Sequence, residues 1–244
     1  MARSGSVCAG RPGGAVSGWT LVIDTAAGIN IGLANAGRPV AARVVNSTRR
    51  HVEVLQPMLG ELFGSAGIGP QDLGLIGVGT GPGPFTGLRI GIVTARTLGL
   101  VAGVAVRGFG TLDAIALGWF AGANRPDGEV LVVTDALRKE LYWASYGPDG
   151  VREQGPAVGA PESLPMLPAG GPGTTGYPQV FAGRVPPGAP VGLDAALVAA
   201  RIAELPDTGL EPVYLRKPDA EAPRTRKSAL AGGRLRLPGF MEER

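Results

Sequence analysis

The order of the apolar segments limits the fold of this chain more than any other feature of the sequence. Three short apolar segments follow one another at residues 21–25, 29–34 and 40–45, separated by turns that contain Gly, Asn or Pro. Short strands joined by tight turns are typical of an antiparallel meander. From residue 73 to 120 the pattern becomes strand, helix, strand and helix. Such alternation indicates parallel pairing in a sheet that helices cover.

A helical segment lies between the meander and the alternating part. Its apolar residues recur at spacings of three and four, which places them on one helical face: Leu55, Met58, Leu59, Leu62 and Ala66. Pro57 lies inside this pattern, so we expect either a kink or a helix start close to it. The whole arrangement predicts an α/β fold whose first lobe is ribonuclease-H-like and covers residues 19–121.

The strand pattern restarts weakly after residue 128. The expected strands of this part are residues 129–136, 140–147 and 150–158. Residues 156–190 are then rich in Pro and Gly, and residues 194–205 form the one later helix that we expect. We interpret the chain as a duplicated, two-lobed α/β protein with mixed sheets flanked by helices, in which a reduced second lobe covers residues 122–217.

The start of the chain differs in composition from the part that follows. Residues 1–18 are rich in Gly, Ser and Arg and lack the apolar centre of a secretory signal, so we interpret them as a flexible extension. They contain the one cysteine, Cys8. No internal disulfide can form, which fits a cytoplasmic protein. No apolar run reaches the roughly 20 residues of a membrane span, so no membrane contact is expected.

The basic charge of the chain is concentrated at its C-terminal end. Residues 216–244 hold eight Lys or Arg and four Asp or Glu, whereas the rest of the chain sums to a net charge of −1. We interpret residues 218–244 as a basic tail without fixed structure. The alternative is that the tail contacts nucleic acid or an acidic partner.

The stretch GTGPGPFTGLRIGIVTARTLGL, residues 79–100, joins a Gly/Pro-rich turn to an apolar helix that we expect to begin near Gly87 with Thr86 as its cap. Such a turn can bind a phosphate. However, Gly87, Gly91, Ala95 and Gly99 recur at every fourth position, and interior glycines weaken a helix by about 1 kcal/mol each. We therefore interpret the stripe as a surface of close approach, either inside the fold or across a subunit interface.

Three residues are candidates for a nucleotide site. Asp24 and Thr25 end the first strand in the sequence VIDT, and Asp135 follows a later strand in a similar way. Carboxylates at such positions lie near magnesium and phosphate in actin-like and sugar-kinase-like folds. The alternative is that Asp24 caps its own turn. The chain has no GxxxxGK[ST] motif, so it is not a P-loop protein. We interpret the site as vestigial and expect no cofactor.

His51 is the single histidine, and it lies at the start of the first helical segment. A histidine-based metal site needs further imidazole or thiolate ligands, which this chain cannot supply. A Ser–His–Asp arrangement would have to use His51, and no serine lies in a G-x-S-x-G turn. The sequence therefore predicts neither a metal site nor a catalytic site.

Several segments, taken in order, resemble the TsaB family of threonylcarbamoyladenosine biosynthesis proteins. They are LVIDTAAGINIGLA, HVEVLQPMLGELF, GVGTGPGPFTGLRIGIVTARTLGL, GFGTLDAIAL, VTDALRKELYWASY and PVYLRKPDA. The resemblance covers roughly residues 21–220, and GPGPFTGLRIG is its most specific part. The family pattern usually has Ser at the positions of Val52 and Pro84.

This resemblance implies a two-lobed actin-like fold with a reduced second lobe, and a protein without catalytic activity. TsaB proteins are paralogues of TsaD, which transfers the threonylcarbamoyl group to the adenosine beside the anticodon of ANN-decoding tRNAs. The TsaD segment that carries metal-binding histidines matches residues 106–116 here, where no histidine stands. The family is sometimes labelled as M22 glycoproteases, but no protease site supports that label here.

The resemblance also implies partners. TsaB pairs with TsaD through the two helices of its first lobe, and the ATPase TsaE joins the pair. Carried over by position, the contact residues would be His51, Leu55, Met58, Leu59, Leu62, Ile90, Gly91, Thr94, Ala95 and Leu98. Contact with tRNA would be indirect or through the basic tail. An exposed apolar helical face also favours a self-dimer when the partner is absent.

A second hypothesis is an actin-like ATPase or kinase. It would use Asp24 and Asp135 as magnesium-associated carboxylates, with the Gly/Pro-rich turn close to phosphate. It rests on analogy at the level of the fold, which is a weak guide to activity. The interaction hypothesis explains more of the sequence, namely the small-residue helix, the missing metal ligands and the incomplete nucleotide motifs.

Overall fold

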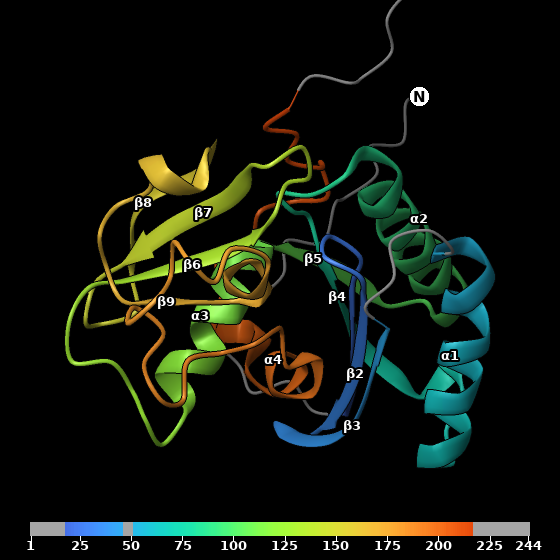
Figure 1. The fold of residues 1–244 in the computed structure, drawn as a ribbon. Helices are drawn as coiled ribbons and strands as arrows, with labels where there is room; N and C mark the ends of the chain where they lie inside the picture. The colour runs from blue at the N-terminus through green and yellow to red at the C-terminus, as the bar shows by residue number, and fades with distance from the viewer. Residues whose placement is uncertain (1–17, 46–50, 217–244) are drawn as a thin grey trace, which may run out of the picture.

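The computed structural model describes residues 18–45 and 51–216, of which His51 and Val52 are described without their side chains. A five-stranded sheet forms the first lobe (Figure 1). Its strands are β1 (Trp19–Asp24), β2 (Ile29–Asn35), β3 (Arg38–Val45), β4 (Leu73–Gly79) and β5 (Ala105–Phe109), in the order β3-β2-β1-β4-β5. Strands β1, β2 and β3 pair antiparallel, whereas β4 pairs parallel with both β1 and β5. The predicted meander and the predicted parallel pairs are both confirmed.

Helices cover both faces of this sheet (Figure 1). Helices α1 (His51–Ala66) and α2 (Phe85–Ala102) share one apolar core with the sheet, and α3 (Thr111–Ala121) and α4 (Ala195–Arg201) share another. Helix α4 lies against β2 so closely that a Cβ atom on Gly32 would stand 2.3 Å from the backbone carbon of Ala195. Its first turn is capped by Asp194, whose carboxylate accepts from the backbone N–H groups of Ala196 and Leu197.

The second lobe is built on a four-stranded sheet. Its strands are β6 (Val130–Asp135), β7 (Leu141–Tyr146), β8 (Arg152–Gly159) and β9 (Ala169–Gly170), in the order β8-β7-β6-β9. The three strands expected from sequence are present. Between β8 and α4 the chain forms only the short β9 and single turns of 3₁₀ helix, η2 (Pro161–Ser163) and η3 (Pro172–Gly176). The Pro- and Gly-rich composition of this segment explains the absence of longer elements.

The start of α2 differs from the expectation. The helix begins at Phe85, its flanking residue is Pro84, and no side chain caps it. Thr86 is therefore inside the first turn, and the prediction that it caps the helix is wrong. A proline suits this position because its φ is fixed and no N–H is lost from the helix. Helix α1 continues through Pro57 from His51 to Ala66.

Within the described residues, α2 is also the one helix with the length and apolar composition of a membrane span. Its glycine face packs inside the first lobe, since Gly87, Leu88, Gly91, Ile92, Ala95 and Gly99 are buried. A core helix passes the same test of length and composition, so this finding does not favour a membrane.

Candidate functional site

Asp24 is the last residue of β1 and is completely buried. One carboxylate oxygen accepts from the N–H of Ala26 at 3.0 Å, and the other accepts from the hydroxyl of Thr111 at 2.6 Å. Burial raises the pKa of Asp24, and these two hydrogen bonds oppose the rise. Gly79 on the neighbouring strand leaves the necessary space, because a Cβ atom there would stand 1.9 Å from the carboxylate. Asp24 thus has the turn-capping contact that the sequence analysis kept as its alternative.

Thr25 ties the end of β1 to helix α2. Its hydroxyl donates to the carbonyl of Gly87 at 2.8 Å, and a Cβ atom on Gly91 would stand 2.3 Å from the same oxygen. At the other end of the helix, a Cβ atom on Gly99 would stand 2.5 Å from the side chain of Val106 on β5. The small-residue stripe therefore does mark a close approach, and the residues approached, Thr25 just after β1 and Val106 on β5, lie within the fold.

Asp135 ends β6 and is exposed. Its carboxylate accepts from the N–H of Leu137 at 2.8 Å, at the start of a tight turn. It lines an open pocket of about 330 Å³, whereas Asp24 lines a cavity of about 30 Å³, the space of about one water molecule. Only Pro172 lines both the pocket at Asp135 and the cavity at Asp24. The structure thus does not bring the two carboxylates into one cavity large enough for a nucleotide.

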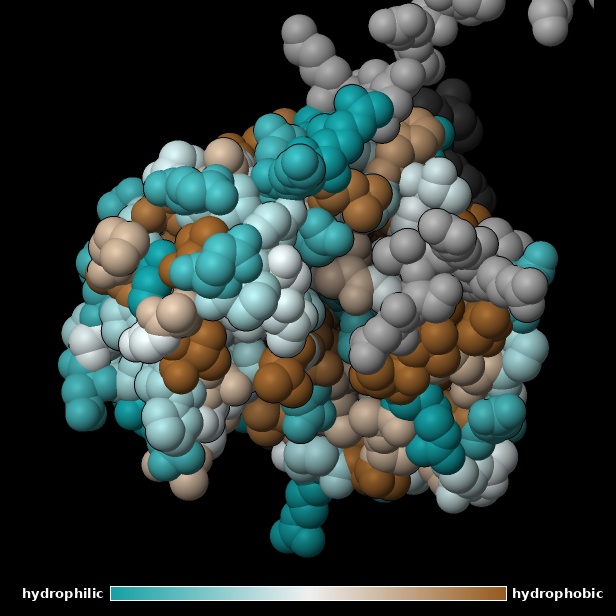
Figure 2. Space-filling view, viewed as in Figure 1, coloured by the Kyte–Doolittle hydropathy of each residue, from teal (hydrophilic) through white to brown (hydrophobic). Residues whose placement is uncertain are grey.

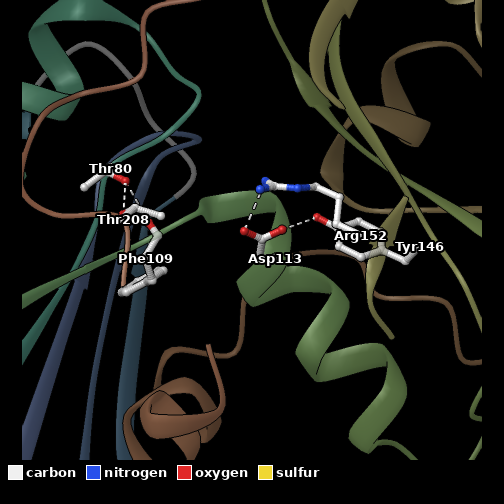
Figure 3. A network of polar contacts seen from close by, with 6 residues as sticks. All are labelled: Thr80, Phe109, Asp113, Tyr146, Arg152 and Thr208. Carbon is white, nitrogen blue, oxygen red and sulfur yellow. Dashed lines mark hydrogen bonds and ion pairs between the residues drawn. The ribbon is translucent and has the colours of Figure 1, made fainter. Parts of the chain in front are cut away.

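The Gly/Pro-rich turn is covered by the C-terminal part of the described chain. This strap, residues 205–216, crosses the ends of β4 and β5, where the N–H of Val213 donates to the carbonyl of Thr80 at 2.8 Å. The hydroxyls of Thr80 and Thr208 lie 2.8 Å apart, and Thr80 also donates to the carbonyl of Phe109 (Figure 3). The loop that the sequence suggested for phosphate binding therefore supports the strap instead.

The strap has no periodic pattern in the sequence and its contacts join residues far apart, so it could not be predicted from local patterns. The glycine at position 108 could have indicated a close contact on β5. A Cβ atom there would stand 1.6 Å from the carbonyl oxygen of Gly209, so the strap requires glycine at this point of β5. At its end the strap reaches the second lobe, where Arg216 pairs with Glu140 at 3.2 Å.

The contact residues carried over from the family resemblance separate into two groups in the structure. Leu55, Met58, Leu59, Leu62, Gly91 and Ala95 are buried in the core between the sheet and helices α1 and α2. These six residues expose little or no surface in the folded chain and contribute to the core of the first lobe. Ile90, Thr94 and Leu98 are partly exposed. The side chain of His51 lies outside the described residues.

The outer face of α2 presents apolar side chains that the sequence analysis did not single out. Leu100 is 85% exposed, Val101 73% and Val93 61%, and Thr97 is exposed between them. Val93, Thr97 and Leu100 follow helical spacing on the side opposite the glycine stripe. This helical spacing is the pattern from which the exposed apolar face could have been predicted. Helix α1 lies beside α2 on the same face of the sheet (Figure 1).

Further apolar side chains are exposed on the edge strand β3, where Val40 is 48% and Val44 52% exposed. Figure 2 shows apolar patches over this view of the molecule, including the side on which α1 and β3 lie. Among the described residues, no group of three or more His, Cys, Asp or Glu side chains is placed to hold a metal ion.

Comparison with known proteins places this two-lobed fold in a family. Residues 42–179 match the family described as "TsaD: tRNA N6-adenosine threonylcarbamoyltransferase". An uncharacterised protein of Mycobacterium tuberculosis is 41% identical over 182 residues, which are 73% of this chain and 81% of that protein. The TsaB protein of Escherichia coli is 37% identical over 132 residues, which are 53% of this chain and 55% of that protein.

Solved structures agree with this assignment. YeaZ from Pseudomonas aeruginosa superposes with a TM-score of 0.62 at 25% identity, over 81% of this chain and all of that one. The two-lobed architecture and this similarity define an actin-like α/β protein. The chain belongs to the TsaD family and, within it, to the TsaB proteins. It spans 49% of the length of a Mycobacterium leprae relative and about half of the named TsaB proteins.

Proposed function

We propose that this chain is a non-catalytic partner subunit of TsaD. In this role it takes part in forming the threonylcarbamoyl group on N6 of the adenosine beside the anticodon of ANN-decoding tRNAs. Family membership supports the pathway, since the relatives in Escherichia coli and Bacillus subtilis are named for tRNA threonylcarbamoyladenosine biosynthesis. The observation that carries the partner role is the apolar outer face of α2.

This outer face, Val93, Thr97, Leu100 and Val101, has the composition of an interface centre. Single exposed apolar residues are common on protein surfaces, but three large ones on one helix form a patch, which typically marks an interaction site. Complete burial of a Val or Leu side chain contributes about 1.5–3 kcal/mol. Burying this face against a partner would therefore supply a substantial part of the free energy of a stable pair.

Polar and charged side chains border the apolar face, as at the rim of a typical interface. Arg89 and Arg96 are exposed on α2, and Glu53, Gln56 and Glu61 are exposed on α1. Ile90, Thr94 and Leu98 are partly exposed on α2, and Ile90 and Leu98 also pack against the core of the first lobe. We propose that the two helices together form the surface that contacts TsaD, with the buried residues of α1 holding it in place.

The test is sedimentation of this chain mixed with TsaD of its own organism, with each protein alone as a control. We expect a one-to-one complex, and a self-dimer of the isolated chain that TsaD displaces. Leu100→Asp should weaken the complex tenfold or more, because burying an unpaired carboxylate is strongly unfavourable. The matched control is Met166→Asp, since Met166 is 83% exposed in the second lobe. Normal pairing by Leu100→Asp, or no complex at micromolar concentrations, would contradict the proposal.

Two further partners belong to the proposal. TsaE joins the pair, and tRNA is contacted indirectly or through residues 218–244, which lie outside the described residues. Removing the residues after Lys217 should then weaken tRNA binding by the complex and reduce its dependence on salt. If neither changes, the tail has no part in tRNA contact.

The competing ATPase or kinase hypothesis predicts magnesium-dependent ATP binding that Asp24→Ala abolishes. The geometry favours the opposite result. Asp24 faces a cavity of about 30 Å³ rather than a pocket of nucleotide size, and its carboxylate is already bound to Ala26 and Thr111. We expect no heat in a calorimetric titration of the isolated chain with Mg-ATP. Binding lost on Asp24→Ala would favour the enzyme hypothesis instead.

A further inference from the structure

A larger cavity than the two described above lies on the other side of helix α3, away from Asp24. It has a volume of about 460 Å³ and opens between α3, the β7–β8 turn and the segment that follows α4. Thr111 and Ile115 of α3 face the small cavity at Asp24, whereas Asp113 and Leu117 face this one. The volume lies within the range of pockets that hold small ligands, roughly 300–1,000 Å³.

One wall of this cavity contains a buried ionic network. The side chain of Asp113 is 8% exposed, and it accepts from the hydroxyl of Tyr146 at 2.8 Å and pairs with Arg152 at 3.3 Å. Figure 3 shows the Asp113 carboxylate on α3 between these two groups, which come from β7 and β8. The carboxylate is thus already paired, and the remaining capacity for polar contacts lies with the donors around it.

Three arginine side chains line the cavity: Arg125, Arg152 and Arg201. Each guanidinium group carries five N–H donors and no acceptor. Within the described part of the chain, Arg201 uses two nitrogens for Glu204, Arg152 uses one for Asp113, and Arg125 uses one for the carbonyl of Pro148. Most of the donors are therefore open to a ligand that carries acceptors.

Three carboxylates also line the cavity. Those of Asp113 and Glu204 pair with Arg152 and Arg201, and that of Asp149 accepts from the N–H of Val151. Most of the other lining residues are apolar. Leu117 and Phe120 come from α3, and Leu205 and Pro206 come from the segment after α4. Arg125 lies over the ring of Phe120, with 5.7 Å from its guanidinium carbon to the ring centroid. An aromatic or aliphatic body would be buried against this lining, while an anionic group reached the guanidinium groups.

We propose that this cavity binds a small organic anion, namely an apolar or aromatic body that carries a carboxylate or a phosphate. Both groups are planar or multidentate acceptors that match the guanidinium fork. The outer face of α2 lies on the opposite face of the first-lobe sheet, because α1 and α2 pack on one side and α3 and α4 on the other. The ligand can therefore be bound while a partner occupies α2.

The test is titration of the full chain with three probes that share one aromatic body: 1-naphthyl phosphate, 1-naphthaleneacetate and the uncharged 1-naphthaleneacetamide. Binding is followed by backbone amide chemical shifts in NMR spectra. We expect one or both anions to bind and to shift signals of α3 and the β7–β8 turn, and the amide to bind at least about tenfold more weakly, as expected for loss of charge-assisted hydrogen bonds. Binding by one anion alone would identify which group the cavity prefers.

Two variants place the binding in the cavity. Arg125→Gln removes a guanidinium whose contacts are the Pro148 carbonyl and the Phe120 ring, and it should weaken anion binding about tenfold. Ala121→Trp at the exposed end of α3 should fill the cavity and abolish binding. Lys139→Gln, at the exposed turn between β6 and β7, also removes one positive charge; it is the matched control and should bind as the unchanged chain does. No binding by either anion, equal binding by the amide, or unchanged binding in both cavity variants would overturn the proposal.

Discussion

Replacing Gly91 by alanine tests the close approach of α2 to the sheet. The added Cβ atom would stand 2.3 Å from the Thr25 hydroxyl oxygen and 3.3 Å from its methyl carbon. Thr25 is completely buried and holds the carbonyl of Gly87 with that hydroxyl. Rotating the side chain away would therefore leave a buried polar group without its partner. The substitution should destabilise the fold, although alanine is the better helix former.

The magnitude follows from three contributions. Alanine gains about 1 kcal/mol over glycine in a helix. Loss of the Thr25–Gly87 hydrogen bond costs about 1–3 kcal/mol, and an overpacked core costs about 1–3 kcal/mol. The net loss of unfolding free energy is about 1–5 kcal/mol, which lowers Tm by about 2 °C or more in a chain of this size.

The matched control is Gly60→Ala in helix α1. Gly60 is exposed, and a Cβ atom on it would meet nothing within 4 Å. This variant should gain up to about 1 kcal/mol, so the same substitution in two helices should change stability in opposite directions. Urea unfolding of both variants measures the difference. If Gly91→Ala is as stable as Gly60→Ala, the proposed packing of the stripe against Thr25 is wrong.

Three further substitutions test other parts of the structure. Asp24→Asn should become more stable relative to the unchanged chain as pH rises above about 4, because the raised pKa of Asp24 in the fold makes the stability of the unchanged chain fall with rising pH. The free energy of unfolding of both chains, measured from pH 4 to 8, tests this. Parallel curves of unfolding free energy against pH would refute it. Thr208→Val should lose about 0.5–1.5 kcal/mol of unfolding free energy, because the hydrogen bond to Thr80 is lost. It should also speed hydrogen exchange at the amide of Val213. Unchanged protection of that amide would show that the strap does not depend on the Thr80–Thr208 pair. Leu100→Ser should leave unfolding within about 0.5 kcal/mol, because Leu100 is 85% exposed; a larger loss would mean that α2 packs differently.

Local patterns were sufficient to predict most of the fold. Apolar runs and turn residues indicated the antiparallel β1, β2 and β3, and the alternation after residue 73 indicated the parallel pairs that β4 makes. The start of α2 was misplaced because Thr86 is a good cap by residue type, whereas Pro84 fixes the entry of the chain through its backbone. The strap could not be predicted, because its contacts with Thr80 and Gly108 depend on the folded arrangement of two strand ends.

The proposed partner surface shows a different limit of sequence patterns. The apolar face of a helix is equally visible in the sequence whether it contacts a core or a partner, and in α1 that face, with Leu55 and Leu62, is the core. Helix α2 has two faces that could pack against the sheet, one lined by glycines and the other by Val93 and Leu100. Only the first can approach a strand closely, since Gly91 and Gly99 leave room for Thr25 and Val106. The packing of the small face directs the large apolar residues outward, and for this reason the glycine stripe, although buried, determines which side of α2 is exposed.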